Sequence, residues 1–537
     1  MPAPRSRVPR PLTKSQFVAG VQCHRLLWWR VHEPNAPELV PTPDQQARFD
    51  AGRRVGEVAR AYVPGGELIG FRHWETDQKI ADTRKRLAAG APALYEAAFA
   101  ASDAYAVVDI LERDGDGFRL VEVKSSTSVK PEHLPDLALQ LHVARASGLD
   151  VRGVEVMHLN RECRHPDLSN LFTRADVERD LAHWLPQVPE IVAAQRAALA
   201  GPLPDVAIGD HCFEPHECPF RGRCWPRWPE DHISTLYLMR RRALELEAKG
   251  YHSIHDLPGE LRLNPMQTRQ VRAVQSGSLV VEPGLVEALK EFESPLAFID
   301  FETVAPAIPV WPGCRPWENV PVQFSVHVRD RGGAWRHVEW LAEGPDDPRP
   351  ALAERLVDAC RHAGALVAYH AAFERDCLRV LALGAPHLAT ELGEMELRLL
   401  DLLPAVRNHV YHPKFGGSFS LKAVLPALVP ELTYDDLEVK DGARATVELW
   451  RLVFERDALP ARHAARLREA LLRYCERDTW AMVRLLDRLR ELATTLVVAP
   501  TTVPAGDAEA EPAPVLVRRA ARTARATPRA VQLDLGL

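Results

Sequence analysis

The chain has 537 residues, which fits about two to four domains of roughly 100–200 residues each. Hydrophobic residues make up 46% of it, enough for substantial cores, and the net charge of −6 excludes a globally basic nucleic-acid binder. No run reaches the ~18 apolar residues of a membrane span, so we expect a cytoplasmic protein with no membrane partner. In a reducing compartment its nine cysteines are expected to be free thiols or metal ligands.

Residues 12–230 contain the elements of a first domain. A capping box at Thr13–Gln16 predicts a helix that continues through Leu27 and carries Cys23. The further expected elements are a helix over 44–62, strands within 93–124 and over 151–159, and helices over 133–140 and 176–200. Residues 202–230 are rich in proline and cysteine with little periodicity, which is typical of a segment ordered by a metal.

The rest of the chain divides into three parts. Residues 231–290 are expected to form a small helical linker module, whose arginines either contact phosphates or make a solvated face. These arginines are Arg240, Arg241, Arg242, Arg269 and Arg272. Residues 294–497 alternate strands and helices, the pattern of an α/β domain, and begin with a buried strand at 296–299. Residues 498–537 are expected to be a disordered tail.

A β-hairpin is predicted where Asp114-Gly115-Asp116-Gly117 lies between two apolar stretches. With Gly115-Asp116 as the loop, Asp109 pairs with Glu122; with Asp116-Gly117 as the loop, it pairs with Lys124. Paired residues share a face and side chains alternate, so both registers place Asp109, Glu122 and Lys124 on one face. Two carboxylates can hold Mg²⁺ for phosphodiester cleavage, and Lys124 can stabilise the developing charge. A surface hairpin with a Glu–Lys pair is the alternative.

The motifs Val108-Asp109-Ile110 and Val121-Glu122-Val123-Lys124, with Gln140 on the next helix, resemble those of the PD-(D/E)XK nucleases of the RecB type. The similarity is strongest to their iron–sulfur members among CRISPR-associated and helicase-linked nucleases. It covers roughly residues 12–230. The resemblance implies a nuclease domain in which Gln140 adds a polar contact to the site.

Four cysteines bracket this segment. Cys212, Cys218 and Cys224 form a compact set that needs a distant fourth ligand, for which Cys23 is the natural candidate. Four cysteines suit an iron–sulfur cluster or a structural zinc, but the closely spaced pairs usual for zinc are absent. The resembling nucleases hold a [4Fe-4S] cluster with one N-terminal and three C-terminal cysteines, which implies that cofactor here. Their first C-terminal interval is shorter, however, and unligated thiols are the alternative.

A second set of acids occurs in the later domain. Asp300 and Glu302 lie two apart on one buried strand and therefore share a face. Glu374 follows a second apolar strand and opens a helix, and Tyr474 and Asp478 lie four apart on another helix. Converging from separate elements, the four acids could hold two Mg²⁺ or Mn²⁺ ions and activate a water for in-line attack, with Tyr474 positioning that water.

The spacing of these residues resembles the DEDD exonucleases of the DnaQ type, in the subgroup with Y-x-x-x-D in its third motif, on an RNase H-like fold. Asp300 and Glu302 match the first motif, and Tyr474 and Asp478 the last. Glu374 stands where that family normally has Asp, and a degraded site is the alternative. With Gly313-x-x-Pro316-Trp317, the whole pattern resembles a bacterial family that fuses an iron–sulfur RecB-type nuclease domain to a DnaQ-like domain.

The final residues, Gln532–Leu537, resemble the short peptide with which bacterial polymerases dock on the sliding clamp; a frayed leucine-rich end is the alternative. Taken together, the patterns predict an α/β chain with a PD-(D/E)XK domain, an iron–sulfur region and an RNase H-like domain. Its expected function is that of a metal-dependent nuclease acting on DNA in repair, replication or defence. A non-catalytic nucleic-acid-binding scaffold and an RNase are the rival hypotheses.

Overall fold

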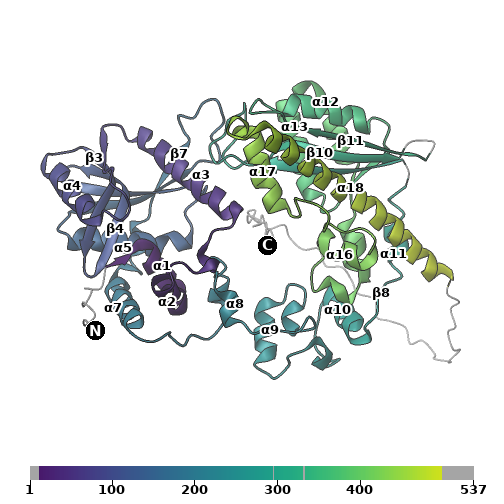
Figure 1. Ribbon diagram of the computed structural model, residues 1–537, viewed down its shortest axis with the longest axis horizontal. Helices are drawn as coiled ribbons and strands as arrows, with labels where there is room; N and C mark the ends of the chain where they lie inside the picture. Colours follow the sequence, from purple (N-terminus) through teal and green to yellow (C-terminus); the bar gives the residue numbers. More distant parts are fainter. Residues whose placement is uncertain (1–10, 294, 330–332, 499–537) are drawn as a thin grey trace, which may run out of the picture.

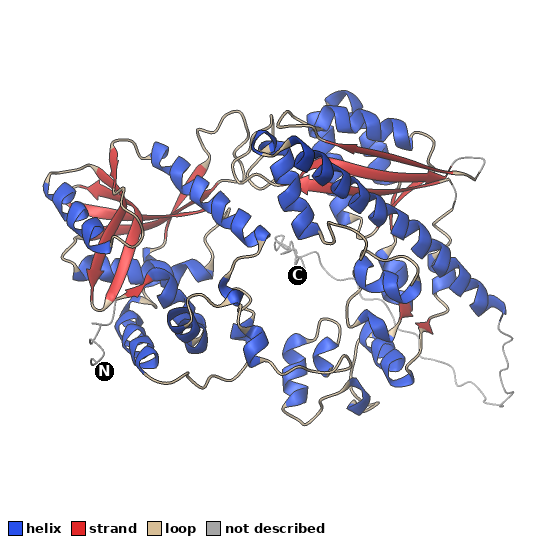
Figure 2. Ribbon diagram, in the orientation of Figure 1, coloured by secondary structure: helices blue, strands red, loops and turns tan. Residues whose placement is uncertain are grey.

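The computed structural model describes residues 11–293, 295–329 and 333–498. The protein is a mixed α/β structure with two sheet-bearing lobes, and short helices join them along one side (Figure 1, Figure 2). The tail from residue 499, including the predicted clamp-binding peptide Gln532–Leu537, lies outside the described residues.

The first lobe is built on a seven-stranded sheet. Its order is β2 (Gly66–Leu68), β3 (Ala93–Ala101), β4 (Ala104–Asp114), β5 (Gly117–Lys124), β6 (Val151–Leu159) and β7 (Phe172–Asp176), with β1 (Leu12–Thr13) paired to β4. Strands β3, β4 and β5 form an antiparallel meander, and β5 runs parallel to β6 through the crossover helix α5 (Leu134–Ala146). The strands predicted within 93–124 and over 151–159 are confirmed.

The β4–β5 hairpin adopts the first of the two predicted registers. Asp114 pairs with Gly117, so Gly115-Asp116 is the loop, and Gly115 takes the left-handed backbone conformation (φ +60°) that this turn requires. The ladder runs on to Ile110 and Val121, and the same register places Asp109 opposite Glu122.

Helices surround this sheet. They are α1 (Lys14–Gln22), α2 (His24–His32), α3 (Pro43–Ala59), α4 (Thr76–Ala88), α6 (Glu178–Leu181), α7 (Val188–Ala200) and α8 (Arg221–Cys224). The capping box of Thr13 and Gln16 is confirmed. The prediction that Cys23 lies on a continuous helix is wrong, because Cys23 is extended and separates α1 from α2. The helix predicted over 176–200 is likewise divided into α6 and α7.

The segment between the lobes carries α9 (Arg240–Glu247), α10 (Pro265–Ser276) and α11 (Leu285–Ala288), and its strand β8 (Val280–Val281) pairs with β14 (Val410–Tyr411) of the second lobe. Arg269 is buried, and its guanidinium donates hydrogen bonds to the carbonyls of Arg407 (2.9 Å) and Asn408. The two predictions for Arg269, that it contacts phosphates or lies on a solvated face, are therefore wrong. Its buried side chain binds this segment to the second lobe instead.

A five-stranded sheet forms the second lobe, in the order β11 (Trp335–Leu341), β10 (Val320–Arg329), β9 (Leu296–Val304), β12 (Ala365–Ala368) and β13 (Leu399–Asp401). The first three strands are antiparallel, and β12 and β13 run parallel to β9. Ile299 and Phe301 on β9 face a core that includes helices α12 (Arg349–Cys360), α13 (Ala372–Gly384) and α14 (Ala389–Leu397). Phe298 faces the opposite core, so the alternate residues Asp300 and Glu302 point to that side.

The opposite face of this sheet is covered by α16 (Leu421–Leu428), α17 (Gly442–Phe454) and the 38-residue α18 (Ala461–Val498), while α15 (Leu403–His409) leads into β14. The apolar residues of these helices join Phe298, Val320 and Val322 in one core. The buried strand predicted at 296–299 and the alternation of strands and helices after it are confirmed.

The two lobes touch through the segment 305–319, which follows β9 and which we call the seam loop. Ala307, Ile308 and Trp317 of this loop pack on Val55, Leu159, Cys163 and Leu171 of the first lobe. The Trp317 indole donates a hydrogen bond to the carbonyl of Ser125 (2.6 Å), and Gly313 N–H donates to the carbonyl of His165 (2.8 Å). Helix α3 also packs against α17. The seam loop that follows β9 is thus hydrogen-bonded to the residue that follows β5.

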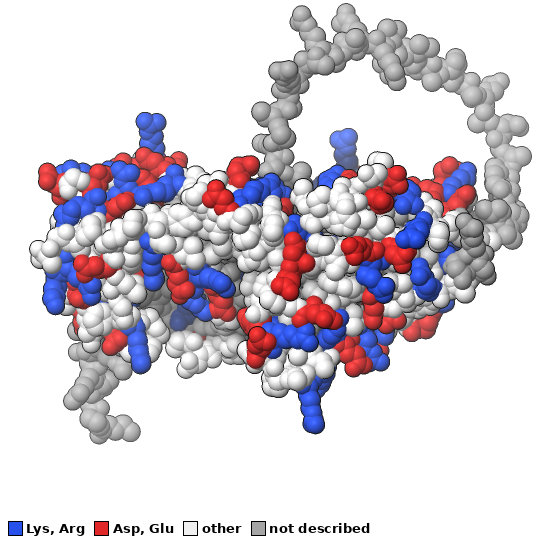
Figure 3. Space-filling model, turned by 90° about the horizontal axis from the view of Figure 1, so that it is seen from above, with Lys and Arg blue, Asp and Glu red and all other residues white. Residues whose placement is uncertain are grey.

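On the face seen in Figure 3, Lys and Arg side chains are mixed with Asp and Glu, and neither sign covers a lobe. Within the described ranges, no helix is long and apolar enough to cross a membrane.

Candidate metal centres

Three acids of the second lobe converge from two elements. Asp300 and Glu302 come from β9 and Asp478 from α18, and each offers a carboxylate oxygen that lies within 4.8 Å of the other two. The strand supplies two of them because its side chains alternate, and α18 crosses the same face of the sheet. This grouping is close enough for all three to share a bound cation.

Glu374 approaches the same acids from the first turn of α13. It is 4% exposed, and its Oε2 is buried without a hydrogen-bond partner in the described part of the chain. Asp376, two residues further on, is exposed and pairs with Arg379, so it faces away as the helix geometry predicts. A buried carboxylate oxygen without a partner is costly, so this carboxyl group is stable here only when it is protonated or when a cation is bound.

The pKa values of all four acids lie above their usual range. Burial raises the pKa of Asp300, Glu302, Glu374 and Asp478, and negative neighbours raise it further for Asp300, Glu302 and Glu374. Lys422 offsets part of this effect for Asp300, Glu302 and Asp478. Four acids and one nearby ammonium leave a large negative charge to be neutralised when the acids are ionised.

Two tyrosines and a lysine border the acids. Lys422, near the start of α16, donates a hydrogen bond to the Tyr474 hydroxyl (2.8 Å), and the Tyr434 hydroxyl donates to Asp478 Oδ1. The ammonium lies over both rings, 4.7 Å from the centre of Tyr474 and 5.4 Å from that of Tyr434. Tyr434 was not predicted, and it could not be, because it comes from a loop 44 residues before Asp478 with no motif around it.

In the first lobe, Glu122 is the centre of a second polar cluster. It is 2% exposed, its Oε1 accepts hydrogen bonds from Lys124 (2.7 Å) and Lys14 (2.8 Å), and its Oε2 accepts one from Gln140 (2.8 Å). Asp109 lies beside it on β4, where its Oδ2 accepts a hydrogen bond from the Val123 backbone (2.8 Å). The structure thus brings together the four residues predicted for this site.

Two members of this cluster were not predicted. Asp136 accepts hydrogen bonds from Lys124 (2.9 Å) and Gln140 (3.1 Å), and Lys14 of α1 lies 3.6 Å from it. Asp136 carried a usable signal, since it precedes Gln140 by four residues on one helix and so shares its face. Lys14 carried none, because it reaches Glu122 across 108 residues of sequence.

The electrostatics of this cluster differ from those of the second lobe. Although burial opposes it, the ammonium groups of Lys124 and Lys14 hold the pKa of Glu122 well below its usual range. Burial and the Glu122 charge raise the pKa of Asp109 to about 7. Three carboxyl groups lie here beside two ammonium groups. Much less additional positive charge is therefore needed to neutralise them than at the second centre.

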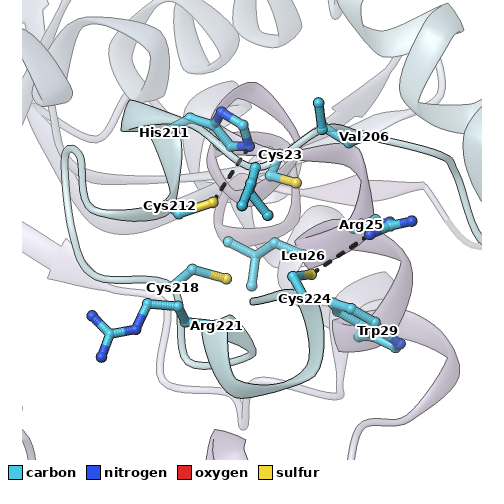
Figure 4. Close-up of a pocket in the computed structure, with 12 residues that line it drawn as sticks. Cys23, Arg25, Leu26, Trp29, Val206, His211, Cys212, Cys218, Arg221 and Cys224 are labelled. Carbon is cyan, nitrogen blue, oxygen red and sulfur yellow. Dashed lines mark hydrogen bonds between the residues drawn. The ribbon is translucent and has the colours of Figure 1, made fainter. Parts of the chain in front are cut away.

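The four cysteines Cys23, Cys212, Cys218 and Cys224 line one pocket between α1, α2 and the segment 206–224 (Figure 4). The break at Cys23 turns its sulfur into this pocket, and Gln22 holds the opposite wall by donating to the carbonyls of His211 (2.8 Å) and His216 (2.7 Å). Burial, together with the other three cysteines, raises the pKa of Cys218 to about 11. Because the thiolate and not the thiol is a metal ligand, Cys218 would lose its proton on binding a metal.

Spacing of the sulfur atoms bears on the kind of cofactor. In the described chain, several groups of side chains have ligand atoms that all lie within 4.8 Å of one another. The four cysteines do not form such a group. A tetrahedral zinc with Zn–S bonds of about 2.3 Å would require sulfur atoms about 3.8 Å apart. His211 lies beside Cys212, with its Nε2 3.7 Å from the sulfur, and Arg25 approaches Cys224 at 3.8 Å.

Comparison with known proteins gives one family match. Residues 297–420 are similar to a domain of unknown function (DUF2779), a stretch that holds Asp300, Glu302, Glu374 and the seam loop. No curated protein matches the chain.

Proposed function

We propose that the protein is a metal-dependent nuclease that acts on DNA. The observation that carries the proposal is the close group of Asp300, Glu302 and Asp478, together with buried Glu374, which interacts electrostatically with Asp300 and whose Oε2 lacks a partner among the described residues. The strand order β11-β10-β9-β12-β13, with acids on the central strand, supports an RNase H-like fold. The β3-β4-β5 meander followed by α5 and a parallel β6 supports a PD-(D/E)XK fold for the first lobe.

Mg²⁺ or Mn²⁺ fits the second centre, because hard oxygen donors from four separate carboxyl groups are the ligands these ions prefer. Asp300, Glu302, Glu374 and Asp478 would hold two such ions. When bound, they lower the pKa of an attacking water and neutralise charge on the phosphate. The spare oxygen of Glu374 is the ligand position that remains open in the described site.

The remaining side chains of this centre orient the reactants. Lys422 fixes the Tyr474 hydroxyl by a hydrogen bond, which leaves that oxygen in a defined place beside the acids to position the water. Tyr434 orients Asp478 in the same way, as an outer hydrogen-bond donor to a ligand carboxylate does.

At the first centre, Asp109 and Glu122 would hold one Mg²⁺, with Gln140 orienting Glu122. Lys124 would stabilise the negative charge that develops on the phosphate. In the described structure the ammonium groups of Lys14 and Lys124 both donate to Glu122 Oε1.

The cysteine pocket suits a [4Fe-4S] cluster better than zinc. A cluster binds each thiolate to a different iron atom, so its four sulfur ligands stand further apart than those of one zinc ion. The cluster would tie α1 and α2, which carry Lys14 and Cys23, to the segment 206–224.

The function is tested with labelled single- and double-stranded DNA and RNA in Mg²⁺ or Mn²⁺, using the wild type, Glu122→Ala, Asp300→Ala and the double variant. We expect DNA to be cut, each single variant to lose one class of product, and the double variant to be inactive. Asp376→Asn, an exposed acid beside the site, is the matched control and should keep full activity. Cleavage that persists in the double variant would refute the proposal, and cleavage of RNA alone would refute the choice of DNA.

The cofactor is tested by iron and sulfide analysis of anaerobically purified protein. We expect brown protein with broad visible absorbance that Cys218→Ser loses and Cys163→Ser, a buried cysteine outside the pocket, retains. Colourless protein that contains zinc would contradict the cluster assignment.

A further inference from the structure

A third group of ligand atoms lies far from the two acid centres in sequence, in the segment between the lobes. His232, Glu247 and His252 each offer one atom within 4.8 Å of the other two. None of these residues belongs to the motifs that predict nuclease activity. The group combines two imidazoles with a carboxylate, which is a donor set for borderline transition metals rather than for Mg²⁺.

The local fold brings these residues together. Helix α9 ends at Glu247, and Gly250, in the left-handed conformation (φ +91°), turns the chain back so that His252 returns alongside His232. Ile233 N–H donates to the carbonyl of His252 (3.2 Å), and Ile254 N–H donates to that of Asp231 (2.8 Å). The two histidines are therefore held by backbone hydrogen bonds and not by chance proximity of mobile side chains.

The decisive atom is His232 Nε2. The ring is 2% exposed, and Nε2 is buried with no hydrogen-bond partner in the described chain, 3.9 Å from Glu247 Oε1. Nδ1 accepts a hydrogen bond from the backbone N–H of Ser234 (3.1 Å), the Ser234 hydroxyl lies 2.9 Å from the same nitrogen, and Trp228 stacks on the ring at 3.8 Å. A metal bound at Nε2 would need the ring proton on Nδ1, where the Ser234 hydroxyl can accept it in exchange for the hydrogen bond from the Ser234 backbone.

We propose that His232, Glu247 and His252 form a binding site for a divalent transition-metal ion, of which Zn²⁺ suits the donor set best. Three protein ligands leave a fourth position open, and exposed His252 places that position toward solvent. The ion would clamp the end of α9 to the start of the segment that joins the lobes.

The site is tested with Co²⁺ as a spectroscopic substitute for Zn²⁺, added to the full-length protein in excess Mg²⁺ so that the acid centres are occupied. We expect His252→Ala and Glu247→Gln each to bind one Co²⁺ fewer than the wild type. Both side chains reach the surface, so these variants should fold. His255→Ala, an exposed histidine paired with Asp231 and outside the group, is the matched control and should bind as the wild type does.

A second readout separates this site from the cysteine pocket. Co²⁺ bound by thiolates absorbs strongly in the near ultraviolet. The spectra of Co²⁺-loaded wild type and His252→Ala should therefore differ in the visible range and not in the near ultraviolet. In thermal denaturation, Zn²⁺ should raise the melting temperature of the wild type more than that of His252→Ala. Equal Co²⁺ binding by wild type and His252→Ala would overturn the proposal, as would an equal loss in His255→Ala.

Discussion

At the scale of single residues, the two acid centres differ in the partners that their buried carboxyl groups have. Glu122 is ionised because Lys14 and Lys124 lie on one of its oxygens. Glu374 has no such support, and its pKa is raised by burial and by Asp300. Positive side chains therefore offset the acids of the first centre, whereas the acids of the second centre stay protonated or need the cations proposed above.

Replacing Glu374 with Gln should leave the metal-free protein at least as stable as the wild type, because it removes a buried carboxyl group whose Oε2 has no partner in the described chain. The same change should weaken Mn²⁺ binding by about tenfold or more, since a ligand oxygen is lost. Isothermal titration calorimetry measures this affinity. Asp376→Asn should bind Mn²⁺ as the wild type does. Unchanged affinity in Glu374→Gln would mean that this side chain is not a ligand.

Replacing Lys14 with Met should lower the free energy of unfolding by about 1–3 kcal/mol, because buried Glu122 and Asp136 then share only Lys124. Urea denaturation measures the loss. Lys130→Met, which removes a more exposed lysine paired with Glu132, should cost less than about 1 kcal/mol. Equal losses in the two variants would show that Lys14 does not support the buried acids.

At the scale of helices and strands, the features that depend on neighbouring residues could be predicted from the sequence, whereas those that depend on distant residues could not. The hairpin, the capped start of α1 and the acids of β9 follow from turn residues, caps and alternation, all of which are local. The break at Cys23 does not, because it depends on a pocket whose other wall is nearly 200 residues away. Lys14, Tyr434 and the burial of Arg269 were missed for the same reason.

Strand β10 meets α18 through His327, which makes the second lobe sensitive to acid. His327 shares a hydrogen bond with Thr479 (2.8 Å), and burial lowers its pKa to about 4. The unfolded histidine titrates near pH 6.5, so the unfolded chain binds more protons between about pH 6.5 and about pH 4, and stability falls as the pH falls through this window. The loss should be about 2 kcal/mol between about pH 7 and about pH 5.

His327→Gln should remove this part of the pH dependence, as measured by urea denaturation at the two pH values. His362→Gln, at an exposed histidine, should keep the wild-type dependence. If His327→Gln loses stability with falling pH as steeply as the wild type, His327 does not titrate as described.

At the scale of the whole molecule, the seam loop links the two centres. It begins directly after β9, which carries Asp300 and Glu302, and its Trp317 binds the carbonyl of Ser125, the residue after Lys124. Trp317 holds a left-handed backbone conformation (φ +58°), which bulky residues seldom adopt, so the surrounding contacts must compensate for its cost.

Trp317→Ala, made in an Asp300→Ala background so that only the first centre acts, should lower the rate of DNA cleavage by about tenfold or more through misplacement of Lys124. Hydrogen exchange should rise in both 123–127 and 305–319. Trp74→Ala, at an exposed tryptophan of the first lobe, should change neither quantity. Unaltered exchange at 123–127 would show that the seam loop does not order the end of β5.

The seam loop also determines how the protein can be dissected. Val55, Leu159, Cys163 and Leu171 are fully buried in a small apolar cluster that includes residues of the second lobe. A first lobe produced alone would expose that patch to water and favour aggregation. The smallest unit fit for biochemical study is therefore the pair of lobes with the segment between them, and the chain is less modular than its two sheets suggest.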